Sequence, residues 1–310
     1  MPPTVKISTM RATAPLPDLP GLLESWTVHL RAERKSDETV KSYTAGVQQF
    51  LDWCAHEGMP TALDRPSVNA WVAAMLERGS EAATARARQL AVRRFSAWLV
   101  AEEEIPRDEL VGLAPPKLDQ KVTPRLTEDQ IRALVRACAG REFRDRRDEA
   151  LVRFMLEAVV RAGEVVAMTT ADLDLTRGLA VVRRGKGGKG RPVPFGPQTG
   201  RALDRYLRLR RTHRLADTPA LWLGDRGKGF SYDGLYRALT YRADLAGIPD
   251  FHPHVTRHTA AQRWLSAKGS EGGLMAVAGW TRRDMLDRYT RATASERAAE
   301  EARRLALGDF

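Results

Sequence analysis

The sequence predicts a mainly α-helical protein with a small β component, divided into two domains. Residues 20–104 show the helical spacing of apolar residues and almost no strand signals. The stretch 105–125 is rich in proline and has little periodicity, which is typical of an interdomain linker. Residues 126–310 are again helical, apart from two short apolar runs around a glycine-rich segment. A length of 310 residues also fits two domains of very roughly 150 residues each.

Composition and charge favour a soluble protein that binds a polyanion. The chain is 43% hydrophobic and 29% charged, so it can bury a sizeable core. Its 50 Lys and Arg against 39 Asp and Glu give a net charge of +11, which makes nucleic acid the leading partner. No apolar run is long enough to span a membrane, so we expect no membrane partner. Cys54 and Cys138 are too few for a disulfide framework and too isolated for a zinc site.

Residues 1–19 contain several prolines and no continuous apolar segment. They are predicted to form a disordered tail and not a signal peptide. We therefore expect the protein in the cytoplasm.

The clearest helix of the first domain is predicted from Ser36 to Gly58. Its apolar residues recur at spacings of three and four, at Val40, Tyr43, Val47, Phe50, Leu51 and Cys54. Ser36 is the expected N-cap, Asp37 and Glu38 lie near the positive helix end, and Gly58 ends the helix.

Two more helices are predicted in this domain. One fits Val68–Arg78 and stops at Gly79. The other fits Glu81–Glu102, after Ser80, and is expected to bury Leu90, Phe95, Trp98 and Leu99. Its opposite side carries basic residues that either form a solvated face or contact phosphate. With a lysine of the preceding helix, the candidate DNA-binding residues are Lys41, Arg86, Arg93 and Arg94.

The second domain opens with a capping box from Thr127 to Gln130, which begins a helix over Glu128–Ala139. A buried helix over Asp145–Val159 follows. A β-hairpin with a glycine-rich turn is then predicted from three consecutive segments, Leu179–Arg183, Gly185–Gly190 and Arg191–Phe195. Helices return after the hairpin.

Several motifs that would indicate other enzyme classes are missing. The glycine-rich segment is followed by Arg191-Pro192 and a strand, whereas a phosphate-binding loop needs Gly-Lys-Ser/Thr opening a helix. The sequence also contains no His-Glu-x-x-His, no Gly-x-Ser-x-Gly and no EF-hand loop. What remains as candidate chemistry is a set of basic residues.

These basic residues can hold an anion. His254 and Arg257 are three residues apart, so on a helix they project to one side. Arg161 follows an apolar helix, and Glu164 lies one helical turn further on, where it can orient a guanidinium. Near the C-terminus, Gly279-Trp280 precedes Tyr289 by nine residues.

Five motifs of the chain, taken in order, resemble the active-site signature of the tyrosine recombinases, the phage integrase family. They are Arg161, Lys186 in Gly-Lys-Gly, His254-x-x-Arg257-His258, Gly279-Trp280 and Tyr289. Ser36-x-x-Thr39-x-x-x-Tyr43, running to Phe50-x-x-Trp53, is similar to the family's helical core-binding domain. The resemblance covers about residues 20 to 300. Two motifs depart from the common pattern. Val159-Val160-Arg161 stands for Gly-Leu-Arg, and Ala278-Gly279-Trp280 stands for Leu-Gly-His, where tryptophan is a known variant.

The resemblance implies a core-binding domain over 20–104 and a mixed α/β catalytic domain over 126–310. It also implies attack by a tyrosine oxygen on a DNA phosphodiester, giving a 3′-phosphotyrosyl bond and a free 5′-hydroxyl. Arg161 and Arg257 are then the candidates for binding the nonbridging oxygens, whose charge grows in the transition state. Tyr289 is the candidate nucleophile. Cationic neighbours favour its phenolate, or His254 helps to remove its proton.

The remaining roles follow from what each side chain can donate. Arginine does not give up a proton at neutral pH, which explains a lysine at position 186 as the proton donor to the leaving 5′-oxygen. Trp280 can only donate a hydrogen bond to a phosphate oxygen and pack the site. Glu164 supports an arginine, and His258 either lines the pocket or packs. No metal, nucleotide or other cofactor is expected, because the phosphotyrosyl bond keeps the energy of the cleaved diester.

The implied partners are double-stranded DNA with paired half-sites and further copies of the chain. A helix over Ala292–Leu307 is the candidate for docking on a neighbouring subunit in a tetramer. Only about twenty residues precede the first helical domain, so a two-domain recombinase without an arm-binding domain fits best. Two alternatives stay open, a type IB topoisomerase-like strand transferase and a catalytically silent DNA-binding regulator. The sequence does not indicate the DNA target, nor whether the enzyme serves a phage, a chromosome or another mobile element.

Overall fold

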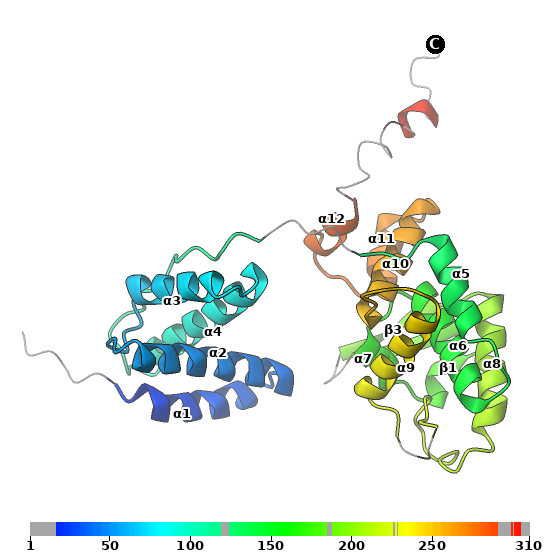
Figure 1. The fold of residues 1–310 in the computed structure, drawn as a ribbon, viewed down its shortest axis with the longest axis horizontal. Coiled ribbons are helices and arrows are strands. Elements are labelled where there is room, and N and C mark those ends of the chain that lie inside the picture. Colours follow the sequence, from blue (N-terminus) through cyan, green and yellow to red (C-terminus); the bar gives the residue numbers. More distant parts are fainter. Residues whose placement is uncertain are drawn as a thin grey trace, which may run out of the picture. The chain divides into compact units, whose positions relative to one another are not determined.

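The computed structural model describes residues 17–118, 124–184, 188–225, 227, 229–290, 299 and 301–304. The chain forms two compact units, Met1–Lys121 and Val122–Phe310 (Figure 1). The boundary falls within the proline-rich stretch over 105–125.

The described part of the first unit contains α1 (Leu19–Ala32), α2 (Asp37–His56), α3 (Arg65–Glu77) and α4 (Ala82–Ala101). An N-cap residue precedes each of the first three helices, and its side chain accepts a hydrogen bond from a backbone N–H of the first turn. These N-caps are Asp18, Ser36 and Asp64. Two predicted boundaries were wrong for this reason. The predicted tail over 1–19 overlaps α1, because Asp18 caps that helix and Leu19 is buried. The second predicted helix starts at Arg65 and not at Val68, because Asp64 caps it.

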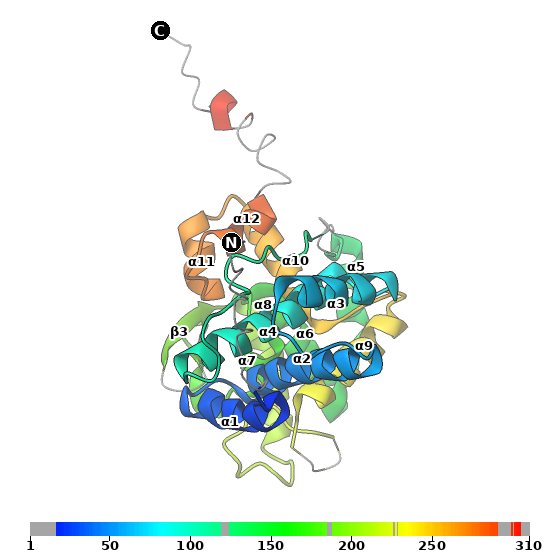
Figure 2. The ribbon, with the colours of Figure 1, turned by 90° about the vertical axis from the view of Figure 1, so that its left-hand side faces the viewer.

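The helices of the first unit enclose one hydrophobic core, in which α1 and α4 both pack against α2 (Figure 2). The crossing of α2 and α4 is close at Gly46, where an added Cβ would lie 2.7 Å from the Cβ of Ala91. Phe95 and Leu99 of α4 are buried as predicted, but Leu90 is 39% exposed. Leu90 precedes the buried Val92 by two residues, which is about 200° around the helix, so it faces away from the core.

The described elements of the second unit, in chain order, are α5 (Glu128–Ala137), α6 (Phe143–Glu157), α7 (Ala162–Val166), η1 (Thr170–Asp172), β1 (Leu173–Asp174), β2 (Leu179–Arg184), β3 (Gly188–Pro194), α8 (Pro197–Arg210), α9 (Tyr232–Leu245), α10 (Pro253–Ser266), α11 (Glu271–Ala278) and α12 (Asp284–Thr290). The capping box of Thr127 and Gln130 at the start of α5 is confirmed. The predicted end of α6 at Val159 is wrong, because Val159 has a left-handed backbone (φ 51°) that cannot continue the helix.

Strands β2 and β3 form the predicted antiparallel hairpin, and the short β1 adds a third strand in the order β1-β2-β3. In the hairpin Ala180 pairs with Val193 and Val182 pairs with Arg191. Residues 185–187 of the glycine-rich turn, Lys186 among them, lie outside the described residues.

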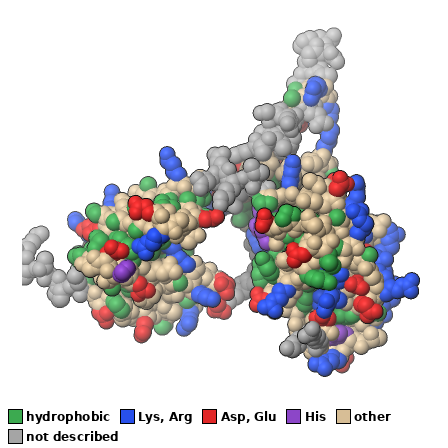
Figure 3. All heavy atoms as spheres, in the orientation of Figure 1, with side chains coloured by type: hydrophobic (Ala, Val, Ile, Leu, Met, Phe, Trp, Pro, Cys, Tyr) green, Lys and Arg blue, Asp and Glu red, His purple; other side chains and the backbone are tan. Residues whose placement is uncertain are grey.

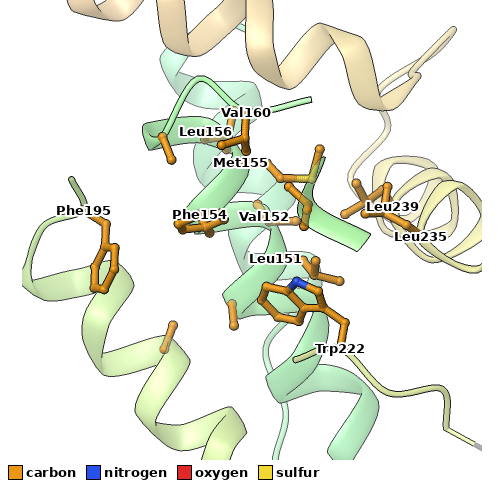
Figure 4. Packing of buried hydrophobic residues seen from close by; sticks show 14 of the residues in the cluster. Leu151, Val152, Phe154, Met155, Leu156, Val160, Phe195, Trp222, Leu235 and Leu239 are labelled. Atoms are coloured by element: carbon orange, nitrogen blue, oxygen red, sulfur yellow. The ribbon is translucent and has the colours of Figure 1, made fainter. Parts of the chain in front are cut away.

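The main core of the second unit surrounds α6. Figure 4 shows Leu151, Val152 and Phe154 of that helix between Phe195, next to α8, and the leucines of α9. A second cluster gathers residues of α10, α11 and α12 with Val159 of the α6–α7 turn. Tyr289 and Trp280 belong to this second cluster, so the C-terminal helices have a packing centre of their own.

Of the helix predicted over Ala292–Leu307, the structure describes residues 299 and 301–304, which are helical. Within the described residues, no helix combines the length and apolar character that crossing a membrane requires. Figure 3 shows Lys and Arg side chains spread among acidic and hydrophobic ones on the visible surface of both units.

Candidate active site

The turn from α6 to α7 supports two groups of the site. Val159 is fully buried, and its carbonyl oxygen accepts a hydrogen bond from Nη1 of Arg257. Two residues later, Arg161 has an extended backbone and is the N-cap of α7. Its side chain is 45% exposed, so its guanidinium is accessible to a ligand.

Glu164 of α7 joins three arginines. It accepts hydrogen bonds from Nη1 of Arg161 at 3.0 Å and from the two terminal nitrogens of Arg191 at 2.9 and 2.8 Å. Nη1 of Arg257 lies 3.9 Å from the same carboxylate. Burial alone would raise the pKa of Glu164, but the hydrogen bonds from Arg191 and from the backbone of Arg161 outweigh it and lower that pKa. Glu164 is therefore an anion that fixes the surrounding guanidinium groups.

Arg191 was missed by the sequence interpretation. Besides its two bonds to Glu164, it donates from Nε to the carbonyl oxygen of Val277 at 2.6 Å, so it links β3, α7 and α11. A signal for it was present in the strand. Side chains alternate between the faces of a strand, so Arg191 shares a face with Val193, which is fully buried. The Arg191 side chain is only 11% exposed, and a largely buried arginine needs an acidic partner, which Glu164 supplies.

Helix α10 supplies the remaining basic groups. Arg257 is almost fully buried and donates from Nη2 to the carbonyl oxygen of Ala278 at 2.9 Å. Burial, followed by the positive charge of Arg161, lowers the pKa of Arg257 to about 10, so it is still a cation at neutral pH. His254 is exposed, and its ring meets the ring of His258 edge-on at 4.3 Å between centroids.

The aromatic pair at the C-terminal end is tightly packed. The rings of Trp280 and Tyr289 are stacked, with centroids 5.1 Å apart and an interplanar angle of 20°. The guanidinium of Arg257 lies over the Trp280 ring at 5.5 Å. The hydroxyl of Tyr289 is 2.5 Å from Nδ1 of His258. Gly279 ends α11 with a left-handed backbone and so turns the chain into Trp280.

The structure thus brings Arg161, Glu164, Arg257, His258, Trp280 and Tyr289 into one contact network. His254 joins it through His258. Lys186 lies outside the described residues. In the part of the chain that the structure describes, no three His, Cys, Asp or Glu side chains gather so that they could hold a metal ion.

The candidate DNA-binding residues lie in the first unit, on two of its helices. Lys41 is exposed on α2, and Arg86 and Arg94 are exposed on α4. Arg93 of α4 is half-buried, which makes it the least accessible of the four.

Comparison with known proteins identifies the class of enzyme. The profile of the phage integrase family matches residues 124–296, and that of the phage integrase N-terminal SAM-like domain matches residues 23–103. Because the first match alone covers more than half of the chain, the chain belongs to the phage integrase family. It is an enzyme of the tyrosine site-specific recombinase class.

Individual relatives agree with this assignment. The tyrosine recombinase XerC of Azotobacter vinelandii is 30% identical over 252 residues, 79% of this chain and 82% of that protein. The crystal structure of XerA recombinase matches with 25% identity and a TM-score of 0.53, covering 92% of this chain and 99% of that one. The Tn1549 transposon integrase, in complex with transposon right-end DNA, has the same fold. It matches with a TM-score of 0.69 and 18% identity, covering 92% of this chain and 99% of that one.

Proposed function

We propose that this recombinase cuts and rejoins DNA through a covalent bond between Tyr289 and the 3′-phosphate of the cleaved strand. The observation that carries the proposal is the position of the Tyr289 hydroxyl. It lies beside His258, on a ring that Trp280 holds by stacking, and Arg257 lies over that tryptophan. A phenol placed against a histidine and next to a buried cation is suited to nucleophilic attack.

The two arginines bind the nonbridging oxygens of the scissile phosphate. A phosphodiester carries one negative charge and its pentacoordinate transition state about two, so fixed cations stabilise the transition state more than the ground state. Glu164 restrains Arg161, and backbone carbonyls restrain Arg257, so both cations are oriented before DNA binds. His254 and Trp280 donate further hydrogen bonds to the phosphate.

Lys186 protonates the 5′-oxygen as it leaves. Most basic residues of the chain are arginines, which do not release a proton at neutral pH. A lysine can release one, which favours Lys186 of the glycine-rich segment as the proton donor. The phosphotyrosyl bond preserves the energy of the diester, so attack by a 5′-hydroxyl rejoins the strand without nucleotide hydrolysis.

A suicide DNA substrate, which loses its 5′-product and traps the covalent adduct, tests the proposal. Tyr289→Phe removes only the nucleophilic oxygen, so we expect no adduct and nearly unchanged binding to the recombination site. Gel mobility under denaturing conditions measures the adduct, and fluorescence anisotropy measures binding. An adduct formed by the Tyr289→Phe protein would refute Tyr289 as the nucleophile.

We infer that the complete reaction needs four copies of the chain on two duplexes with paired half-sites. Strand exchange joins two duplexes, each cut at two positions, which requires four nucleophiles. The helix predicted over Ala292–Leu307 would dock on the neighbouring copy, and Lys41, Arg86, Arg93 and Arg94 would contact the DNA backbone.

Two other functions predict different results in the same assays. A type IB topoisomerase-like enzyme would form the adduct and relax supercoiled DNA but would not exchange strands between two duplexes. A catalytically silent regulator would bind DNA and form no adduct. A strand-exchange assay with two labelled duplexes, together with the adduct assay, separates all three functions.

A further inference from the structure

The hydroxyl of Tyr289 faces His258, the second histidine of His254-Val-Thr-Arg-His258. We propose that His258, and not His254, accepts the proton of Tyr289 as its oxygen attacks the phosphate. The inference rests on the proposed function, because it assigns a residue to the first step of that cleavage.

The distances favour His258 as the proton acceptor. Its Nδ1 is 2.5 Å from the Tyr289 oxygen, a direct hydrogen bond. Nδ1 can accept the tyrosine proton only when Nε2 carries the ring hydrogen, so the proposal assigns the neutral Nε2–H tautomer to His258. A neutral histidine is the form that can take up a proton near pH 7.

His254 is placed for a different task. It precedes His258 by one helical turn, is exposed, and packs edge-to-face with the His258 ring. That position suits contact with DNA phosphate and orientation of the His258 ring. His258 is itself only partly buried.

The surroundings of Tyr289 support loss of its proton. The titratable or charged groups near it include His258, with His254 beside that ring, and Arg257, all on α10. Burial and the charge of Arg161 lower the pKa of Arg257, and the Tyr289 phenolate offsets part of this lowering, because the phenolate and the guanidinium attract each other. Trp280 covers the tyrosine ring and adds no charge.

The step balances without any further reactant. The O–H bond of Tyr289 breaks and its proton moves to Nδ1 of His258, while the phenolic oxygen forms a bond to phosphorus. The bond between phosphorus and the 5′-oxygen breaks, and that oxygen takes a proton from Lys186. On religation the proton returns from His258 to the departing tyrosine oxygen.

The test uses the full chain and the suicide substrate under single-turnover conditions, with saturating enzyme. His258→Gln keeps a polar group that can accept a hydrogen bond but cannot take up a proton. We expect adduct formation about 100-fold slower or worse at pH 7, as for loss of a general base, with DNA affinity little changed.

The pH dependence separates loss of a base from a misplaced tyrosine. Without a base, the reaction depends on tyrosine that has lost its proton to water. Below the ordinary tyrosine pKa of about 10, the fraction of phenolate increases about tenfold for each unit by which the pH rises. The ratio of wild-type to His258→Gln rates should therefore shrink between pH 7 and pH 9. Because Lys186 is present in both proteins, its own pH dependence cancels in the ratio of the wild-type rate to the His258→Gln rate. His254→Gln is the matched control, and its rate ratio to wild type should not shrink in this range.

A second variant guards against a folding defect. His258→Ala leaves a space on a partly exposed ring position, so imidazole in solution should raise its rate about tenfold or more. A His258→Gln rate within about threefold of wild type at pH 7 would overturn the proposal, because general bases contribute at least about 100-fold. A deficit that stays constant to pH 9, together with no rescue by imidazole, would also overturn it. If the wild-type chain forms no adduct that depends on Tyr289, the proposed function itself fails.

Discussion

Val159, two residues before Arg161, combines an unfavourable backbone with a fully buried side chain. Its φ of 51° is in the left-handed region, which costs an L-residue roughly 1–2 kcal/mol and a β-branched one more. The surrounding contacts enforce this conformation, because the side chain packs in the cluster of Trp280 and Tyr289 while the carbonyl accepts from Arg257. The strained turn thus places the carbonyl oxygen of Val159 where it accepts a hydrogen bond from the buried Arg257.

This strain predicts an unusual order of stability. At an ordinary buried helix position alanine is more stable than glycine by about 1 kcal/mol, but glycine adopts a positive φ without penalty. We expect Val159→Gly to be at least as stable as Val159→Ala, although it removes one more carbon. Urea unfolding of both variants measures this. Val152, fully buried in α6, is the control, and there alanine should be the more stable. The same order at both positions would contradict strain at Val159.

Arg191 predicts a pH-dependent loss of stability. Replacing it by methionine leaves Glu164 partly buried with fewer donors, and breaking a buried pair costs on the order of 3 kcal/mol. The pKa of Glu164 is lowered in the wild type, so its contribution is present above the unfolded pKa of about 4.3 and is lost as pH falls through the lower, folded pKa. In Arg191→Met, burial should instead raise the pKa, and the destabilising charge disappears when the carboxyl is protonated.

The difference in unfolding free energy between wild type and Arg191→Met should therefore be large at pH 7 and smaller at pH 4. Urea unfolding at pH 7, 5.5 and 4 checks this. Arg205→Met is a suitable comparison, since Arg205 binds Glu149 from a 38% exposed position and should cost less. An equal cost of Arg191→Met at all three pH values would mean that Glu164 does not depend on Arg191.

At the scale of elements, the end of α11 fixes the approach to Trp280. Gly279 has a φ of 68°, and an added Cβ would lie 3.1 Å from both Nε and Nη1 of Arg191. At Gly272, near the start of the same helix, an added Cβ would meet only open space. The two glycines therefore differ in backbone and in surroundings.

Alanine should have opposite effects at these two glycines. Gly279→Ala should destabilise the second unit by about 1–2 kcal/mol through its left-handed backbone and slow adduct formation by displacing Arg191. Gly272→Ala should be stabilising by about 0.5–1 kcal/mol, because alanine is the better helix former. Thermal unfolding and the suicide-substrate assay give both readouts. A neutral Gly279→Ala would show that Arg191 moves at no cost.

Elements with strong local signals were predictable from the sequence. Ser36 and Thr127 marked the starts of α2 and α5, since a capping side chain acts within three residues of itself. Predictions that depended on tertiary packing were less accurate. Leu90 was assigned to the core because it is apolar, but the facing helices decide which stripe of α4 is buried.

The candidate site divides in the same way. Motif residues could be named individually, because each has a recognisable local pattern. Strand alternation could have marked Arg191 as inward-facing, but it could not have identified the partners Glu164 and Val277, which are 27 and 86 positions away in the chain. The contact between His258 and Tyr289 spans 31 positions and depends on how α12 returns to α10. Local periodicity carries no information about such pairs.

At the scale of the whole molecule, each unit has its own hydrophobic core. All buried residues of the first core lie at or before Leu113, and those of the other two clusters lie at or after Leu126. A chain of this design can bind DNA with two separate modules. Linking two modules raises the effective concentration of the second once the first has bound.

This organisation predicts the behaviour of the separated units. A cut between Lys121 and Val122 should yield two fragments that each fold cooperatively, since neither core contains residues of the other unit. Circular dichroism during thermal unfolding measures this directly. A fragment that stays unfolded alone would contradict the independence of the two cores.

Both fragments should bind a DNA half-site weakly, and the intact chain should bind on the order of 10²–10⁴ times more tightly than either fragment. Because phosphate contacts release counterions, the slope of log affinity against log salt for the intact chain should equal the sum of the fragment slopes. Arg94→Ala, on an exposed position of α4, should lower the slope of the first fragment by about one and leave that of the second unchanged. Fluorescence anisotropy across a salt series gives all these slopes. If the second fragment alone matched the affinity of the intact chain, the first unit would make no productive DNA contact, and Lys41, Arg86, Arg93 and Arg94 would form only a solvated face.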